Sequence, residues 1–243
     1  MTVEDDVALV TGASAGIGKA TAHALAREGA DVALAARRRE RLEAIADTLE
    51  SEYDAETLPV PTDVRDEAAA REMVETTVET FGRLDVLVNN AGVGVGGDVE
   101  ETTSEEYRLM METNVDSVFF ATQAAVPHLR ETDGNLVFVG SFAGQYPRPA
   151  NPIYAATKWW VRGFAHSVEG QIGPDGVGVS VVNPTEVRTE FGSEDGEPLE
   201  DRFGPDEVTE PEEVAEAVVF AASQDRSTVH EIDLYRRDKF DGW

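Results

Sequence analysis

A tyrosine and a lysine stand four residues apart, and a serine precedes them. Tyr154 and Lys158 share one face of a helix that Asn151, followed by Pro152, is expected to begin. An ammonium group beside a phenol favours the phenolate, so we expect Lys158 to lower the pKa of Tyr154 toward neutral pH. A hydroxyl at Ser141 could hold a carbonyl oxygen nearby. Together these residue types are suited to proton transfer at a carbon–oxygen bond.

The same pair also has a plain structural interpretation. Tyr154 would then be a half-buried helix tyrosine and Lys158 a solvated side chain, because helices produce such pairs by chance. Composition favours the chemical interpretation, since the chain has only three lysines, Lys19, Lys158 and Lys239, against seventeen arginines. A chain that avoids lysine keeps one where a compact, tunable ammonium is useful. Other motifs must decide between the two interpretations.

An apolar strand leads directly to the serine. The run Leu136–Val139 predicts a buried strand, and Ser141 lies just past its carboxyl end. Ligands of open α/β sheets bind at this edge. We therefore expect Ser141, Tyr154 and Lys158 to face one ligand site.

A glycine-rich turn follows the first predicted strand. Val7–Val10 leads straight into Thr-Gly-Ala-Ser-Ala-Gly-Ile-Gly, residues 11–18, and then into a helix. Glycines permit a tight turn and close backbone approach, and a helix N-terminus attracts a pyrophosphate. The spacing is Gly-x-x-x-Gly-x-Gly, and its place between the first strand and the first helix predicts a dinucleotide site. The residues expected to contact the dinucleotide here are Gly12, Ser14, Gly16, Ile17 and Gly18.

The end of the second predicted strand indicates which dinucleotide is bound. An acid about 20 residues beyond the glycine turn would bind the ribose 2′-hydroxyl of NAD. Here Val32–Ala36 runs into Arg37 and Arg38, whereas Asp31 lies at the wrong end of the strand. A 2′-phosphate carries close to two negative charges and suits an arginine fork. We therefore predict NADP(H), with Arg37 as the first contact and Arg38 as the second.

Two of these assignments have structural alternatives. The arginines could simply pair with Glu40 and Glu43 on the following helix, although exposed pairs are worth little and need no special position. Asp63 and Val64 follow the third strand, Leu58–Pro61, and are expected at the adenine. Asp63 could accept a hydrogen bond from the adenine amino group, or it could cap a turn.

Strand and helix patterns alternate along the chain with short connections. This alternation predicts an α/β protein with a single-domain Rossmann fold, in which helices flank both faces of a doubly wound parallel sheet of about seven strands. No linker is evident, so residues 1–243 are expected to form one domain. The predicted strands are Val7–Val10, Val32–Ala36, Leu58–Pro61, Val86–Asn89, Leu136–Val139, Val177–Val182 and Glu231–Tyr235.

Helix termini carry recognisable capping residues. Thr103 and Glu106 form a capping-box pattern, and Thr209 with Glu212 is expected to cap the last helix. The other predicted helices run over Ile17–Glu28, Arg39–Glu52, about Glu67–Phe81, and onward from Asn151.

The charge balance limits the partners. The net charge of −28, from forty-eight acids against twenty bases, argues against nucleic acid or an anionic membrane. Acidic, lysine-poor surfaces are expected in concentrated salt, where the Debye length is only about 3 Å at 1 M. We expect the cytoplasm of a halophile, although an ordinary acidic protein is the alternative.

Metal and targeting signals are weak. The chain has no cysteine, so a disulfide framework and a thiolate metal site are excluded. The N-terminal residues lack the basic and apolar regions of a signal peptide, and no apolar run approaches the roughly 18 residues of a membrane span. The four histidines, which are scattered without ligand spacing, are expected to be surface or packing residues; they are His23, His128, His166 and His230.

Five motifs in register resemble the single-domain short-chain dehydrogenase/reductases across essentially the whole chain. They are residues 11–18, Asn89-Asn90-Ala91-Gly92, Asn114, Ser141 with the Tyr154/Lys158 pair, and the segment 184–189. Thr185 stands where the family usually has glycine, and the C-terminus lacks the family's frequent Asp-Gly-Gly. The ending resembles most the NADP-dependent 3-hydroxy acid dehydrogenases, and the composition suggests a haloarchaeal member.

The resemblance implies roles for individual residues. Tyr154 would be the general acid in carbonyl reduction and the base in alcohol oxidation, with Lys158 lowering its pKa and holding the nicotinamide ribose. Ser141 would orient the substrate oxygen, and Asn114, in mid-helix, would anchor a water that relays protons. No metal is required. Further cofactor contacts are implied at Asn90, Ala91, Gly92, Pro184, Val187 and Thr189, although Asn89 and Asn90 could equally stabilise the sheet.

The substrate is the least determined property. A mobile substrate lid is expected at about residues 186–208. Arg148, Arg188 or Arg202 could recognise a carboxylate, but each could also be a surface counter-charge. The favoured activity is NADP(H)-dependent interconversion of a carbonyl and an alcohol. A 3-oxoacyl-thioester reductase, a sugar dehydrogenase and a non-catalytic NADP-binding regulator remain as alternatives. The family resemblance implies a homotetramer or homodimer whose subunits meet through the two long helices around Asn114 and Tyr154.

Overall fold

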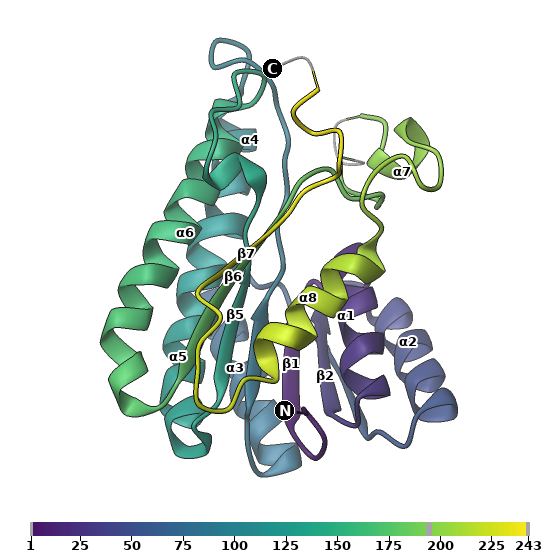
Figure 1. Cartoon of the computed structure of the whole chain (residues 1–243), viewed down its shortest axis with the longest axis vertical. Helices are drawn as coiled ribbons and strands as arrows, with labels where there is room; N and C mark the ends of the chain where they lie inside the picture. Colours follow the sequence, from purple (N-terminus) through teal and green to yellow (C-terminus); the bar gives the residue numbers. More distant parts are fainter. Residues whose placement is uncertain (1, 193–195, 242–243) are drawn as a thin grey trace.

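The seven strands form a single parallel sheet in the order β3-β2-β1-β4-β5-β6-β7 (Figure 1). The computed structural model describes residues 2–192 and 196–241. This order confirms the predicted doubly wound α/β fold, with a switch point between β1 and β4. The strands are β1 (Val7–Thr11), β2 (Asp31–Ala36), β3 (Thr57–Pro61), β4 (Val86–Asn89), β5 (Asn135–Val139), β6 (Gly178–Pro184) and β7 (Glu231–Leu234).

Helices cover both faces of the sheet. One face packs against α1 (Gly16–Arg27), α2 (Arg39–Glu52) and α8 (Pro211–Ala222). The other packs against α3 (Glu67–Phe81), α5 (Ser117–Thr132) and α6 (Pro152–Ile172). The shorter elements are α4 (Ser104–Met111), a π-helical turn η1 (Glu112–Asp116), the 3₁₀ turns η2 (Phe142–Gly144) and η3 (Gly173–Asp175), and α7 (Leu199–Arg202).

The core follows from alternation along fully buried strands. All five residues of β1 are buried, and Ala8 and Val10 face α1 and α8 whereas Leu9 faces α3 and α5. A strand buried on both faces reads as a continuous apolar run, as β1 does. Residues that follow the strands, rather than those within them, are therefore free to carry polar chemistry at the carboxyl edge.

Helix starts largely match their sequence signals. Thr103 and Glu106 form the predicted capping box of α4, and Asn151 Oδ1 accepts a hydrogen bond from the Tyr154 backbone N–H at 3.1 Å. The predicted cap of the last helix is wrong by one residue, because Glu210 and Glu213 form the capping box of α8. Pro211 occupies the first helical position, which makes the residue before it the cap.

The acidic surface pairs many of its arginines with carboxylates. Arg27 lies 2.8 Å from Glu216, and Arg130 lies 2.9 Å from Asp175. Each such exposed pair contributes about 0–1 kcal/mol, so the arginines balance charge more than they stabilise the fold. Within the described part of the chain, no helix combines the length and the apolar content that crossing a membrane requires.

Candidate active site

A cavity of about 870 Å³ lies at the carboxyl edge of the sheet. It extends from the glycine turn after β1, past the ends of β2 and β4, to Ser141 and the first turns of α6. Every predicted catalytic or cofactor residue lines it except Gly18 and Asn114. Motifs that lie far apart in the sequence therefore meet in one space.

The glycine turn has the geometry that a phosphate needs. Gly12 and Gly16 have φ of +69° and +51°, which favours glycine. Ala15, the N-cap of α1, offers no side-chain cap, and the first turn carries no acid. The first N–H groups of α1 are thus left for an anion, so the turn fits the pyrophosphate of a dinucleotide. Gly18 acts by packing, since a Cβ there would lie 2.5 Å from Asn90 Nδ2.

Asn90 braces this turn from the neighbouring strand. Its side-chain amide donates to the Thr11 carbonyl at 2.8 Å, and its backbone N–H donates to Thr11 Oγ1 at 2.9 Å. Asn89, one residue earlier, donates to Thr122 Oγ1 at 3.1 Å on the α5 side. The stabilising interpretation of both asparagines is therefore supported, and Asn90 additionally lines the cavity.

The two arginines after β2 have different partners. Arg38 donates to Ser14 Oγ through Nε and Nη2 at 3.2 and 3.0 Å, and its Nη1 contacts Glu190 at 3.0 Å. Arg37 lines the cavity, and no ion pair joins it to another of the described residues. The alternative was that Arg37 and Arg38 pair with acids on α2. Such a pair is formed instead by the next arginine, Arg39, which lies 3.6 Å from Glu43.

Asp63 already has a strong partner. Arg65 donates to its carboxylate through Nε at 2.9 Å and through its backbone N–H at 3.2 Å. The hydrogen bonds from Arg65 hold the pKa of Asp63 below its usual value, against the effect of partial burial. The turn-capping interpretation of Asp63 is therefore confirmed, although the carboxylate also lines the cavity.

Tyr154 and Lys158 are both buried, with 6% of each residue exposed. Lys158 Nζ lies 5.9 Å from the centre of the Tyr154 ring and donates to the Val139 carbonyl at 2.9 Å. Burial raises the pKa of Tyr154, although a hydrogen bond with Ser141 and the charge of Arg148 lower it.

The expectation that the Tyr154 pKa lies below its ordinary value is therefore wrong, because burial has the largest effect on it. Burial lowers the pKa of Lys158 itself to about 8, so the amine is still mostly protonated at neutral pH and loses its charge as the pH rises above 8. Desolvation penalises the charged form of both groups, and at Tyr154 it outweighs the opposing effects of Ser141 and Arg148.

Ser141 is fixed at the end of β5. It forms the N-cap of η2, where its Oγ accepts from the Ala143 N–H at 3.1 Å, and its own backbone N–H donates to Asn183 Oδ1 at 3.3 Å. Asn183 on β6 is fully buried. The hydroxyl is thus held at the cavity by contacts on both sides.

Asn114 lies in the π-helical turn rather than in a regular helix. Its Oδ1 accepts from the Val93 N–H, and its Nδ2 donates to the Val93 carbonyl, each at 2.8 Å. The same Nδ2 donates to Thr157 Oγ1 at 3.0 Å, on the helix that carries Tyr154 and Lys158. Through these hydrogen bonds Asn114 joins the segment after β4 to α6, behind the cavity wall. The π-helical turn that carries it is a feature often found at functional sites.

A family model described as short chain dehydrogenase matches residues 6–200. The chain belongs to this family. It is therefore an oxidoreductase, as the convergence of its motifs on one cavity predicts.

Relatives of the short chain dehydrogenase span nearly its whole length. Meso-2,3-butanediol dehydrogenase from Serratia marcescens is 33% identical over 95% of this chain and 92% of its own. The structure of an alcohol dehydrogenase from Thermococcus sibiricus complexed with 5-hydroxy-NADP has a TM-score of 0.86 and 34% identity over 96% of both chains.

A third relative binds the other dinucleotide. A 3-ketoacyl-(acyl-carrier-protein) reductase from Brucella melitensis, complexed with NADH, has a TM-score of 0.84 and 28% identity over 96% of this chain and 98% of its own. None of these three is a 3-hydroxy acid dehydrogenase, so the resemblance to that branch gains no support from them.

Two cations that the sequence left without a definite role border the dehydrogenase's cavity. The Arg148 guanidinium lies 5.3 Å from the Tyr154 ring centre. Lys239 Nζ lies 2.7 Å from Glu186 Oε1 and 4.4 Å from the Phe142 ring centre. The scarcity of lysine, which singled out Lys158, applies equally to Lys239 and could have indicated it.

The other arginines considered as carboxylate ligands differ in position. Arg188 is paired with Glu210 at 2.8 Å and does not line the cavity, whereas Arg202 on α7 does. The predicted lid lies partly outside the described residues, because it includes 193–195. In its described part, Val187 forms a β-bridge with Thr209, and Glu190 contacts Arg38 and Arg41.

Two of the histidines that are scattered in the sequence meet in the fold. The rings of His166 and His230 stack with their centres 4.3 Å apart, and Glu231 lies beside them. Sixty-four residues separate the two histidines in sequence, so only the fold, in which α6 side chains reach the start of β7, brings them together.

Proposed function

We propose that this dehydrogenase interconverts a carbonyl and an alcohol with NADP(H), and that Tyr154 is its general acid and base. The observation that carries the proposal is the position of the Tyr154 phenol. It lies buried between Ser141 and Lys158, in the cavity that also contains the uncapped start of α1.

The side chains divide the chemistry among them. The dinucleotide, when bound, supplies or accepts the hydride. Ser141 Oγ orients the substrate oxygen, and Tyr154 gives that oxygen a proton in reduction and removes it in oxidation. Lys158 holds the nicotinamide ribose and keeps positive charge near the phenol, while Asn114 keeps the helix of both residues in place.

The choice of NADP(H) is supported by the residues after β2. Arg37 and Arg38 line the cavity beyond the strand, where a 2′-phosphate would offer oxygens to an arginine fork. Asp31 is at the opposite end of β2, where its Oδ1 accepts from the Glu56 N–H at 2.7 Å. Solved relatives bind either dinucleotide, so the preference depends on these residues of the chain itself.

The remaining cofactor contacts are assigned to residues that line the cavity. Asp63 and Val64 are proposed at the adenine, and Thr189 and Val187 at the nicotinamide carboxamide. All of these line the cavity. Gly12, Ser14, Gly16, Ile17, Asn90, Ala91, Gly92 and Pro184 complete the proposed set.

For the substrate we propose a carbonyl compound with a carboxylate that Arg148 binds. Arg148 is exposed at the cavity, beside the Tyr154 ring, in a chain whose net charge is −28. Arg202 is the second cation on this part of the wall. A 3-oxoacyl-thioester reductase or a sugar dehydrogenase is the competing activity, and a non-catalytic regulator would not need the Ser141, Tyr154 and Lys158 set.

We also propose the setting in which the enzyme works. Its acidity and its low lysine content, three residues, are suited to concentrated salt in the cytoplasm of a halophile. More narrowly, we propose that this halophile is an archaeon. A homotetramer is supported by exposed apolar side chains on α4, α5 and α6, since Tyr107, Phe119 and Trp159 are 40–46% exposed. Residues 1–243 are proposed to form one domain, with a lid at about 186–208.

The test is an oxidation assay of NADPH against NADH in high salt, over a panel of aldehydes, ketones, oxo-acids and sugars. We expect faster turnover with NADPH, and the highest kcat/KM on oxo-acids. Turnover of NADPH with neutral ketones alone would support the proposed reaction but contradict the proposal that the substrate carries a carboxylate. If no member of the panel oxidised NADPH although the protein bound it, the regulator would replace the enzyme.

A further inference from the structure

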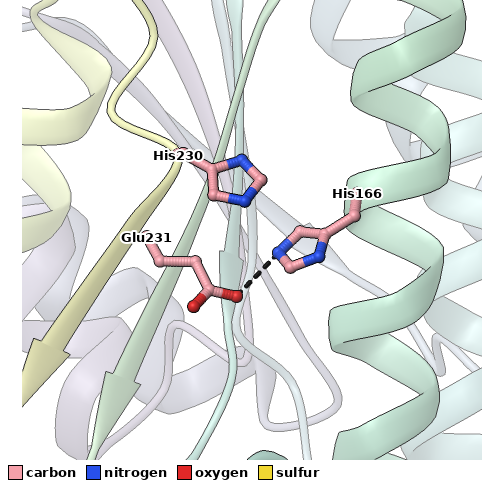
Figure 2. Close-up of side chains that lie close together, drawn as sticks. All are labelled: His166, His230 and Glu231. Carbon is pink, nitrogen blue, oxygen red and sulfur yellow. Dashed lines mark ion pairs between the residues drawn. The ribbon is translucent and has the colours of Figure 1, made fainter.

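Two histidines and a glutamate meet between α6 and the start of β7 (Figure 2). His166 lies on α6, His230 directly precedes β7, and Glu231 is the first residue of β7. One possible ligand atom from each lies within 4.8 Å of the other two. None of the three lines the cavity.

Each histidine has one ring nitrogen close to a carboxylate. His166 Nε2 is 2.6 Å from Glu231 Oε1, yet this buried nitrogen has no aligned hydrogen-bond partner among the described residues. His230 Nδ1 is 2.6 Å from Glu169 Oε2. A carboxylate at Nδ1 places the proton on that nitrogen and leaves the lone pair of Nε2 free. Metal-binding histidines are held in this way by a carboxylate behind the ring.

The local charge is suited to a cation. Glu169 contacts His230 and Glu231 contacts His166, while Asp233 interacts with Arg162. The Arg162 guanidinium donates to both oxygens of Glu231, through Nε at 2.6 Å and Nη2 at 3.2 Å. Three carboxylates against one guanidinium leave two negative charges when both rings are neutral. Protonating two stacked rings would place like charges together, whereas one divalent cation would neutralise the cluster without doing so.

We propose that His166 Nε2, His230 Nε2 and the Glu231 carboxylate bind one divalent transition-metal ion of the zinc class. Imidazole and carboxylate donors suit Zn²⁺ or Co²⁺, and three protein ligands with one water complete a tetrahedral shell. Glu169 is the carboxylate behind His230 and orients its ring. The ion would join α6 to β7, which as the last strand of the sheet pairs on one side only. The proposal does not depend on the enzyme's substrate.

The test uses the full chain, expressed without a histidine tag and stripped with a chelator. Co²⁺ is titrated in excess Mg²⁺, which occupies exposed carboxylates but competes weakly for imidazole. We expect one equivalent of Co²⁺ to give the visible absorption of a tetrahedral site, and Zn²⁺ to remove it. His166→Gln and His230→Gln should each abolish the absorption. Glu169→Gln should weaken binding about 10- to 100-fold.

The matched control is His128→Gln. His128 also lies near a carboxylate, 3.5 Å from Glu75, but no second histidine accompanies it, so its loss should leave the titration unchanged. Absorption that persists in His166→Gln and His230→Gln would overturn the proposal, as would a wild-type chain that gives none. Should either histidine variant fail to fold, the Glu169→Gln variant, whose change is on the helix surface, tests the proposal by itself. An unchanged Co²⁺ affinity in that variant would contradict the metal site.

Discussion

Arg38 Nη1 lies 3.0 Å from the Glu190 carboxylate, so the arginine predicted to bind the cofactor's 2′-phosphate contacts an acid from the segment after β6. Arg41 on α2 binds the same carboxylate at 2.7 Å. Glu190 thus joins the proposed lid to the start of α2. A 2′-phosphate must share or displace this acid at Arg38, whereas Arg37 has no such competitor among the described residues.

Removing the charge of Glu190 should favour NADPH. In Glu190→Gln the repulsion between an acid and the 2′-phosphate is lost, and an exposed pair of this kind is worth about 0.2–1 kcal/mol. We expect NADPH to bind about two- to fivefold more tightly by fluorescence titration, with NADH nearly unchanged. Glu43→Gln is the control, since Glu43 pairs with Arg39 outside the cavity. An equal gain for both dinucleotides would contradict this role.

Reversing the charge at Arg37 should shift the cofactor preference toward NADH. A charge-assisted hydrogen bond is worth about 1.5–3 kcal/mol, so Arg37→Asp should lower the NADPH/NADH ratio of kcat/KM by about 10- to 100-fold. Arg39→Asp, at the first residue of α2, is the control because Arg39 does not line the cavity. A ratio that does not move would exclude Arg37 as the 2′-phosphate ligand.

Removing the Tyr154 hydroxyl should stop the reaction and leave cofactor binding almost intact. A positioned acid–base group contributes about 10²–10⁴-fold, so kcat of Tyr154→Phe should fall by at least that factor. Tyr107→Phe, on an exposed tyrosine of α4, should keep full activity. Turnover that survives in Tyr154→Phe, with weakened NADPH affinity, would move the acid–base role elsewhere.

The buried Lys158 should make stability depend on pH. Its folded pKa is about 8 and its ordinary value is 10.5, so between these values the unfolded chain binds the additional proton and stability rises with pH. The penalty for burying the ammonium is present in full below pH 8. Relative to Lys158→Met, the wild type should gain about 2 kcal/mol of unfolding free energy between pH 8 and 10. Urea unfolding of both proteins measures the difference; parallel pH curves would show that Lys158 remains charged.

Arg148 should discriminate substrates by charge. Arg148→Gln should raise KM for oxo-acids about 10- to 100-fold, the value of one charge-assisted hydrogen bond, and affect neutral ketones much less. Because Arg148 also lowers the pKa of Tyr154, the ratio between the two substrate classes is the informative quantity. Arg188→Gln is the control, since Glu210 holds that arginine outside the cavity. An equal loss for acids and ketones would leave Arg148 with an electrostatic role only.

The sequence by itself determined the fold and most of the proposed site. Strand–helix alternation, the glycine turn and the spacing of Tyr154 and Lys158 are local patterns, and each depends on neighbours within a few residues. In a parallel sheet the carboxyl ends of all strands meet at one edge, so local patterns at those ends also predict a shared cavity. The error at the last helix, where Glu210 rather than Thr209 caps it, is a local one of a single residue.

Only the tertiary structure decided which distant side chains touch. The pKa of Tyr154 depends on burial beneath several elements, and no local spacing reports how much water those elements exclude. The Arg38–Glu190 contact spans 152 residues, and His166 meets His230 because α6 side chains reach the start of β7. Such contacts are set by the packing of whole elements, because a side chain's partner across the fold has no fixed offset along the chain.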